Sequence, residues 1–417
     1  MRYLSEILAA WRPLAAATLG MGTGMSIAGT VTSAIGPSLV ADAGWSKAQF
    51  AMIGTLGLLT ALAMPFVGRL ADVLGVKLTA LIGLVTMPLA LLGYSLTGGS
   101  YTAYLAVFVV QSIICVTTTA TVYTRLVIQF VTHARGLGLA IVACGPALFS
   151  AVGGPLINDY VEAHGWIAAY RALALFVTLT GIATFLLIPG SRGHARAATE
   201  ADSTEKRRAR EDYPEIFRNR AFWILLASMY LCNLPLTLIL VQLKMLVLDN
   251  GITGEGASIM FTALAVGMLL GRFGAGLALD RLKPHVVSFL TLALPALGLF
   301  VLASDYDAPA VVTGSIFLLG FAVGAEGDIL AFLVARHFRT TIYSSVLGLL
   351  TAVTSIAAAS GAMFLSWSLA RSGSFNPFLI LTGSSVMLGA LLLLMLGKGP
   401  DAHERSGQAI GGEPAAA

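Results

Sequence analysis

Long apolar segments recur along the whole 417-residue chain, and the stretches between them contain most of its charged residues. Each segment has about 20 residues or more, which as an α-helix can cross the roughly 30 Å hydrocarbon layer of a membrane. The pattern therefore predicts an all-α membrane protein with twelve transmembrane helices. The predicted spans are approximately 13–41, 47–71, 78–98, 101–131, 136–160, 167–189, 219–248, 255–279, 285–304, 308–336, 342–370 and 375–397.

Composition agrees with this pattern. Apolar residues make up 57% of the chain and charged residues only 11%, whereas a soluble globular chain has about 25% charged residues. The 45 glycines are more simply explained by close packing of membrane helices than by chemistry.

One long polar stretch, residues 190–218, divides the spans into six and six. We therefore expect a helical bundle over 1–189, a cytoplasmic linker over 190–218, a second bundle over 219–397 and a disordered cytoplasmic tail over 398–417. The basic cluster at 206–210 is interpreted as an orienting loop. We expect no nucleic-acid binding, because acidic neighbours dilute this cluster.

Landmarks of the first half recur about 208 residues later. Gly68-x-x-x-Asp72 is matched by Gly276-x-x-x-Asp280, and Gly165 is matched by Gly373. Two further pairs share this offset within one residue: Phe130 with Phe338, and Asp42-Ala-Gly44 with Asp249-Asn-Gly251. Such repeats in a membrane chain indicate two pseudo-symmetric six-helix bundles around a central cavity, an arrangement typical of transporters.

The distribution of basic residues predicts the orientation. Most of the 25 Lys and Arg residues fall in segments that are cytoplasmic if both termini are inside, as the positive-inside rule requires. The compact loops favour a bacterial inner membrane.

The segment from Gly68 to Lys77, which contains Arg69 and Asp72, resembles the loop signature of the major facilitator superfamily. Its weaker copy at Gly276 and Asp280 stands where that superfamily repeats the signature. The resemblance implies that Gly68, Arg69 and Asp72, with the copy, form a cytoplasmic gate between the two halves. The alternative is a solvated loop that merely follows the positive-inside rule.

Shorter segments resemble the monocarboxylate-transporter and oxalate–formate-antiporter branch. They are the outer turn from Asp42 to Gln49, the Gly-Pro pairs at 145–146 and 154–155, and residues 324–328. A Gly-Pro pair in span five also occurs in drug/proton antiporters, so that branch stays open.

Five ionisable residues lie inside predicted spans, where they are costly and therefore functional candidates. Lys244 is close enough to the outer surface to extend toward it. The other four, Arg125, Arg272, Glu326 and Asp328, lie about 12–17 Å from the cytoplasmic surface by helical rise. They form either a substrate-binding layer or two buried salt bridges between helices.

Arg272 is the leading candidate for binding a substrate carboxylate. The relatives in this branch resemble this chain in placing an arginine in span eight, and the resemblance implies that this arginine binds the carboxylate. A guanidinium can bind a carboxylate with two hydrogen bonds and stays charged when buried. Some relatives have an acid one turn earlier, where this chain has Met268. We therefore predict that the coupling proton binds to Glu326 or Asp328, which point about 200° apart on one helix. Further candidate substrate contacts are Arg125, Tyr123 and Asn233.

These observations predict a secondary transporter that moves a small organic anion, a carboxylate being favoured, by alternating access with proton symport. The alternative is a proton-coupled exporter of amphiphilic drugs, although span one has no charged residue between Arg12 and Asp42. Sugar transport is less favoured, because Asn/Gln pairs and aromatic platforms are sparse in the spans.

No nucleotide-binding loop, nucleophile motif or metal-ligand spacing is found in the sequence. We therefore expect no enzymatic activity, cofactor or metal. The expected partners are the anion, protons and the lipid bilayer, and we expect a monomer.

Overall fold

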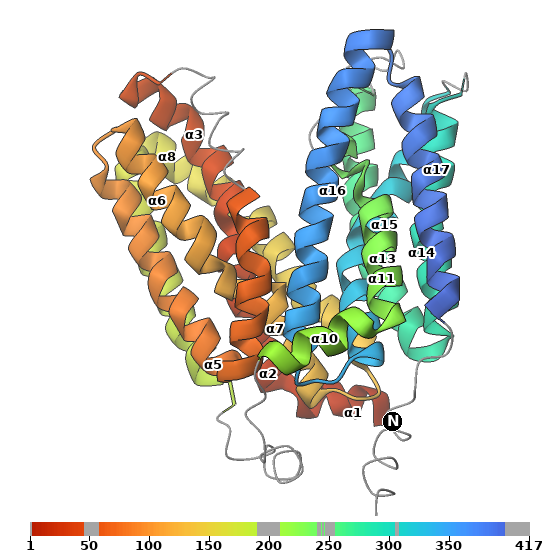
Figure 1. Ribbon diagram of the computed structural model, residues 1–417. Helices are drawn as coiled ribbons and strands as arrows, with labels where there is room; N and C mark the ends of the chain where they lie inside the picture. Colours follow the sequence, from red (N-terminus) through yellow and green to blue (C-terminus); the bar gives the residue numbers. More distant parts are fainter. Residues whose placement is uncertain are drawn as a thin grey trace, which may run out of the picture. The chain divides into compact units, whose positions relative to one another are not determined.

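The structure is a computed structural model that describes residues 2–45, 58–189, 209–239, 243, 246, 255–304 and 308–396 (Figure 1). Helices dominate these residues, as the sequence predicts. The helices and short 3₁₀ turns (η) are, in order, α1 (Arg2–Ala9), α2 (Trp11–Gly22), η1 (Met25–Ile27), α3 (Ala28–Ala43), α5 (Leu58–Leu96), α6 (Tyr101–Ile114), η2 (Cys115–Thr118), α7 (Ala120–Phe130), α8 (Arg135–Leu187), α10 (Ala209–Arg218), α11 (Arg220–Asn233), α13 (Glu255–Arg281), α14 (Pro284–Leu302), α15 (Pro309–His337), α16 (Tyr343–Ser372), α17 (Asn376–Leu393) and η4 (Leu394–Leu396).

The chain separates into two compact units. The first unit comprises Met1–Pro214 and Thr341–Ile356, and the second comprises Glu215–Thr340 and Ala357–Ala417. Helix α16 therefore contributes its first part to the first unit and the remainder to the second. The bundle boundaries expected from the sequence stay a prediction, and this division differs from them in assigning residues 341–356 to the first unit.

Within the described residues, ten helical segments are long and apolar enough to cross a membrane. One of them, Leu58–Leu96, contains predicted spans two and three, which meet at Gly75 with a φ of 78°. Glycine adopts this left-handed conformation without steric cost. Predicted span seven is described only in part, so it is not among the ten.

The turns of the sequence repeat have matching backbone geometry. Gly165 has a φ of 78° and Gly373 a φ of 67°, and both follow the ends of spans. Phe130 is the last residue of α7, and Phe338 directly follows α15. The Asp249–Gly251 copy lies outside the described residues.

The core of the first unit contains a hydrogen-bonded aromatic cluster. The Tyr94 hydroxyl donates to Gln111 Oε1 at 2.7 Å, and the Tyr104 and Tyr170 hydroxyls are 2.9 Å apart. Trp45 contacts the ring of Tyr104 edge-on at a centroid distance of 5.1 Å. Because each buried hydroxyl has a partner, this polar cluster fits inside an otherwise apolar core.

The second unit is built on close contact between α13 and α15. Gly267 and Gly271 on α13 face the backbone of α15, and Gly320 and Gly324 on α15 face the backbone of α13. A Cβ atom at any of the four would overlap a carbonyl group of the facing helix. Two Gly-x-x-x-Gly pairs thus allow the backbones to touch, as the glycine content suggested. This contact fixes the position of Arg272, the residue after Gly271.

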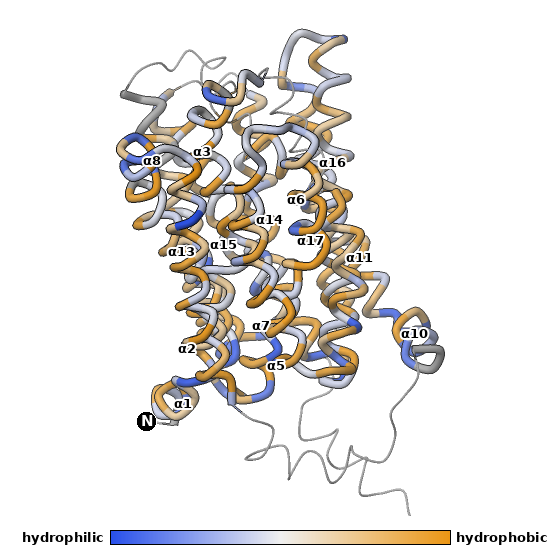
Figure 2. The backbone as a smooth tube through the Cα atoms, turned by 90° about the vertical axis from the view of Figure 1, so that its left-hand side faces the viewer, coloured by the Kyte–Doolittle hydropathy of each residue, from blue (hydrophilic) through white to orange (hydrophobic). Residues whose placement is uncertain are grey.

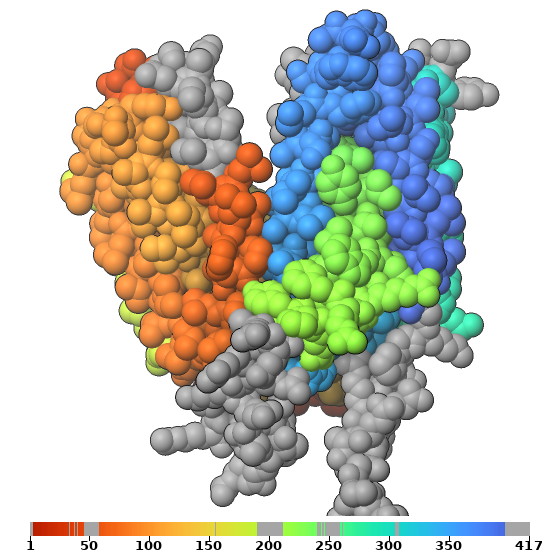
Figure 3. Space-filling model, in the orientation of Figure 1, coloured from red at the N-terminus to blue at the C-terminus, as the bar shows by residue number. Residues whose placement is uncertain are grey.

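Apolar side chains cover the outside of each unit. Hydrophobic residues predominate along the helices in Figure 2, and Figure 3 shows α11 and α17 side by side on one face of the second unit. Trp223, Leu381 and Leu388 on these two helices are exposed. A large exposed apolar surface on a chain with membrane-length helices is the surface expected to face lipid.

Candidate functional site

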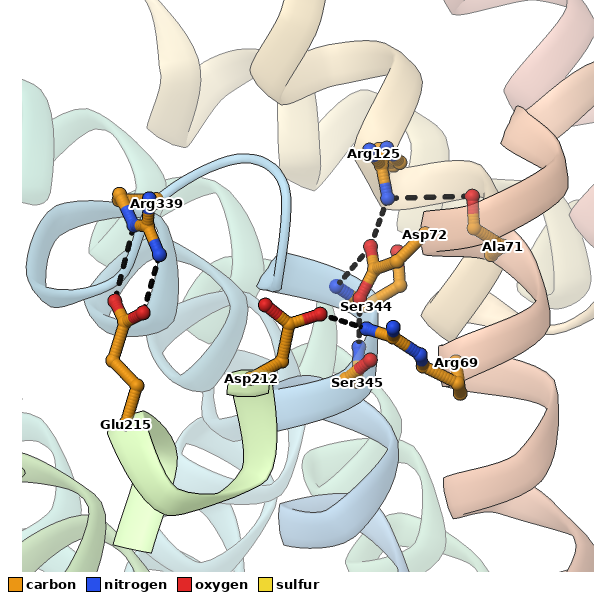
Figure 4. A network of polar contacts seen from close by, with 9 residues as sticks. All are labelled: Arg69, Ala71, Asp72, Arg125, Asp212, Glu215, Arg339, Ser344 and Ser345. Carbon is orange, nitrogen blue, oxygen red and sulfur yellow. Dashed lines mark hydrogen bonds and ion pairs between the residues drawn. The ribbon is translucent and has the colours of Figure 1, made fainter. Parts of the chain in front are cut away.

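The Asp72 carboxylate is the centre of a polar network in the first unit (Figure 4). It accepts hydrogen bonds from the backbone N–H of Ser344 at 3.1 Å and of Ser345 at 2.6 Å. These two N–H groups belong to the first turn of α16, which has no helical partners for them. Asp72 therefore caps α16 and stabilises the positive end of its dipole.

Arg125 on α7 forms an ion pair with the same carboxylate. Its guanidinium also donates to the carbonyl of Ala71 at 3.3 Å. The side chains are 9% exposed for Arg125 and 1% exposed for Asp72, so the pair is buried. Of the two interpretations made for Arg125 from the sequence, the buried salt bridge describes this geometry.

The partner of Arg125 differs from those expected, which were Glu326 and Asp328. Arg125 is five residues from the end of α7 at Phe130, which is about 8 Å of helix. Asp72 lies on α5, three residues before the break at Gly75, and the long arginine side chain reaches it there. Its role as a substrate contact stays a prediction.

Gly68 and Arg69 flank this network. A Cβ atom at Gly68 would overlap the carbonyl of Ser344, so glycine is needed where α5 passes the start of α16. Arg69 forms an ion pair with Asp212 on α10. Within the first unit, the signature residues therefore contact the start of α16 and α10, the helix of the predicted linker segment (the linker helix). A gating role for them stays a proposal.

In the second unit, the linker helix forms another ion pair, between Glu215 and Arg339. The weaker copy of the signature lies at the end of α13, where Gly276 is buried and Asp280 is half-buried.

The second candidate site joins α13 to α15 in the second unit. Arg272 Nε lies 3.9 Å from Asp328 Oδ2 and donates to the Gly324 carbonyl at 3.3 Å. The Arg272 side chain is 21% exposed and that of Asp328 only 6%. Among the described residues, Asp328 Oδ2 has no hydrogen-bond partner. The distance between Arg272 Nε and Asp328 Oδ2 is therefore too long for a hydrogen bond, although Asp328 is buried.

Glu326 points to a different helix. Its Oε1 accepts a hydrogen bond from the Asn233 side chain, which also donates to the Met229 carbonyl at 2.8 Å. Glu326 lines a cavity of about 20 Å³ that is also bordered by Cys232, Pro235 and Pro295. A cavity of this size holds about one water molecule. The two acids thus have separate surroundings, as their spacing on one helix predicts.

Tyr123, another residue expected to contact substrate, is completely buried. Its ring packs against Gly20 of α2, where a Cβ atom would overlap it. Lys244 lies outside the described residues.

Sequence analysis missed Ser344, Ser345 and Asp212, which contact Asp72 and Arg69. Ser344 and Ser345 lie at the beginning of predicted span eleven, so the sequence indicated that their N–H groups are at the start of a helix. Nothing in the sequence relates them to Asp72.

The helical fold and the ten membrane-length segments of the described residues define a multi-pass, all-α membrane protein. Residues 14–242, more than half of the chain, match the family model described as Major Facilitator Superfamily. The chain belongs to this superfamily and is a membrane transporter.

Solved structures agree with this assignment at the level of the fold. The E. coli fucose:proton symporter FucP is 14% identical with a TM-score of 0.73, and the match covers 94% of this chain and 99% of that one. The proton:xylose symporter XylE is 15% identical with a TM-score of 0.73, covering 98% and 99% of the two chains. The human organic anion transporter MFSD10 is 15% identical with a TM-score of 0.67, covering 92% and 99%.

These similar structures have the twelve-helix, two-domain fold of the superfamily. A comparison with curated proteins gives no significant match. The resemblance to the monocarboxylate and oxalate–formate branch stays a prediction.

Proposed function

We propose that this transporter moves a small organic anion, that Arg272 binds a carboxylate group of the substrate, and that transport is coupled to protons. The observation that carries the proposal is the long contact between Arg272 and Asp328. A partly exposed guanidinium lies 3.9 Å from a buried carboxylate. A guanidinium remains protonated under all physiological conditions and favours carboxylates as ligands.

Proton coupling follows from competition at Arg272. When Asp328 is ionised, it competes with a substrate carboxylate for the same cation, and the two anions repel each other. Protonation of Asp328 removes both effects, because a neutral carboxyl group neither pairs as an anion with Arg272 nor repels the substrate. The substrate anion in turn favours protonation, because a like charge nearby disfavours the ionised form of Asp328. Anion and proton then bind together, which is the requirement for symport.

Glu326 is the second candidate for the coupling proton. Its hydrogen bond to Asn233 and its position at a cavity that can hold a water molecule provide a route for proton exchange. Asn233 would then act through Glu326 and would not itself contact the substrate.

The names of the similar structures support different parts of this proposal. FucP and XylE are named as proton symporters of sugars, and MFSD10 is named as an organic anion transporter. A neutral sugar is therefore the second candidate substrate. The names of FucP and XylE support this candidate, although the cavity that Tyr94, Gln111 and Tyr170 border in the first unit is only about 10 Å³, roughly the space for one water molecule.

Purified protein in proteoliposomes distinguishes the candidates. We expect uptake of a radiolabelled mono- or dicarboxylate that an inward-directed proton gradient accelerates, and no uptake of fucose or xylose. Arg272→Lys should retain the charge and lose the two-bond geometry, lowering carboxylate uptake by about tenfold or more. Arg171→Lys, at an exposed arginine of α8, is the matched control and should transport normally.

Three results would contradict the proposal. Normal transport by Arg272→Lys would exclude the arginine as the carboxylate-binding group. Uptake of sugars without any carboxylate would support the second candidate, and drug resistance on expression without either would support an exporter.

A further inference from the structure

Helix α1 has an apolar face that is not covered by the first unit. Leu4 is 65% exposed and Leu8 is 71% exposed. They are four residues apart and therefore lie on the same side of the helix. Trp11, at the junction with α2, is 57% exposed. Large apolar side chains gathered in this way mark a surface that binds a partner.

The opposite side of α1 is attached to the first unit. Glu6 lies about 160–200° around the helix from Leu4 and Leu8. Its carboxylate accepts hydrogen bonds from the backbone N–H groups of Thr132, His133 and Ala134 at 2.7, 2.9 and 3.0 Å. These residues connect α7 to α8. The attachment fixes the rotation of α1, so the apolar face is directed away from the unit.

The position of α1 in the first unit identifies what this face meets. Figure 1 shows α1 lengthwise across one end of that unit, and Figure 2 shows it nearly end-on. It therefore lies across the direction of the spans. It leads at once into the membrane-length segment that starts at Trp11, so its apolar face lies next to the start of a predicted span.

The charges of α1 suit an anionic surface. Arg2 is the first residue of α1, and Arg12 follows three positions after α1 ends, as the second residue of α2; Arg12 is exposed. The carboxylate of Glu6 is directed to the backbone of residues 132–134, away from the apolar face. Helices with an apolar face, tryptophan and flanking basic residues bind at the interface of anionic membranes.

We propose that α1 is an interfacial helix that binds anionic phospholipid at the membrane surface, with Leu4, Leu8 and Trp11 inserted at the boundary of headgroups and acyl chains. Through Glu6 it connects this lipid layer to the turn between α7 and α8. A protein partner, such as a second copy of the chain, is the competing occupant and is an outcome of the test below.

Spin labels on the full chain test the proposal without knowledge of the substrate. Leu4→Cys, Leu8→Cys and Ala9→Cys are labelled in vesicles of phosphatidylcholine with phosphatidylglycerol. Ala9 is exposed and lies about 100° from Leu8, so it is the matched control. Unmodified protein gives the background from Cys115, Cys144 and Cys232.

We expect labels at positions 4 and 8 to collide more with oxygen than with a water-soluble nickel complex, and the label at position 9 to show the inverse. Equal accessibility at all three positions would overturn the proposal, because the face would be solvated. Labels at 4 and 8 that are immobilised and shielded from both reagents would overturn it in favour of a protein partner. The same depth in pure phosphatidylcholine vesicles would overturn the preference for anionic lipid.

Discussion

Asp328 lies 3.9 Å from Arg272, and among the described residues its Oδ2 atom has no hydrogen-bond partner although the side chain is buried. A buried charge is costly unless it is paired and hydrogen-bonded. Protonation of Asp328 would remove this cost, and the proposed proton coupling depends on that.

Replacing Asp328 by Asn should remove the competitor of the substrate and the proton site together. We expect carboxylate affinity at neutral pH to increase by about tenfold, which is about 1.4 kcal/mol, and the acceleration by a proton gradient to be lost. Binding titrations and gradient-driven uptake measure the two effects. Retention of gradient-driven uptake by Asp328→Asn, with its loss in Glu326→Gln, would instead assign the coupling proton to Glu326.

The ion pair between Arg125 and Asp72 should be visible in a double-mutant cycle. Arg125→Gln leaves a buried carboxylate with reduced compensation, so we expect a loss of about 3–5 kcal/mol of unfolding free energy. Asp72→Asn leaves the guanidinium buried without its counter-ion and weakens the cap of α16.

The double variant Asp72→Asn/Arg125→Gln should lose less than the sum of the single variants, because neither buried charge is then left alone. Denaturant titration in detergent provides the four values. Strict additivity would indicate that the two side chains do not interact in solution.

Close contact between α13 and α15 should make Gly324 intolerant of even one methyl group. In Gly324→Ala the new Cβ atom would overlap the Met268 carbonyl, and overpacking of this kind costs about 1–3 kcal/mol. Gly314→Ala on the same helix is the control, because no described atom lies within 4 Å of a Cβ atom there. It should be neutral or gain up to about 1 kcal/mol from helix propensity. Equal thermal stability of the two variants would contradict this packing.

The attachment of α1 through Glu6 should depend on pH. Partial burial raises the pKa of Glu6, but the hydrogen bonds from Thr132, His133 and Ala134 outweigh it and hold the pKa below its ordinary value of 4.5. A carboxyl group with a lowered pKa stabilises the folded state above its unfolded pKa. That stabilisation is lost as the pH falls through the folded pKa.

Glu6→Gln should therefore destabilise the protein by about 1 kcal/mol near pH 7 and by progressively less as the pH falls below the ordinary pKa of 4.5. Unfolding in detergent at several pH values measures the difference from the natural chain. Asp159→Asn, at an exposed site of α8, is the control for the loss of a surface carboxylate. A Glu6→Gln effect that is constant with pH would exclude the charge of Glu6 as its cause.

The sequence by itself determined the all-α membrane fold, the approximate limits of the spans and the membership suggested by Gly68-x-x-x-Asp72 and its copy. These features depend on local properties, namely runs of apolar residues and the left-handed turns at Gly75, Gly165 and Gly373. Depth along a helix also follows from counting residues. The spacing of Glu326 and Asp328, two residues apart on one helix, correctly indicated that they have different neighbours.

Only the tertiary structure decided which charges meet. Arg125 is paired with Asp72, and Asp72 with Ser344 and Ser345, across separations of 53, 272 and 273 residues. Such pairs depend on the rotation of each helix about its axis and on backbone contacts like that of Gly68 with Ser344. Rotation and contact are set by packing over whole helices, and a single sequence contains no direct record of either.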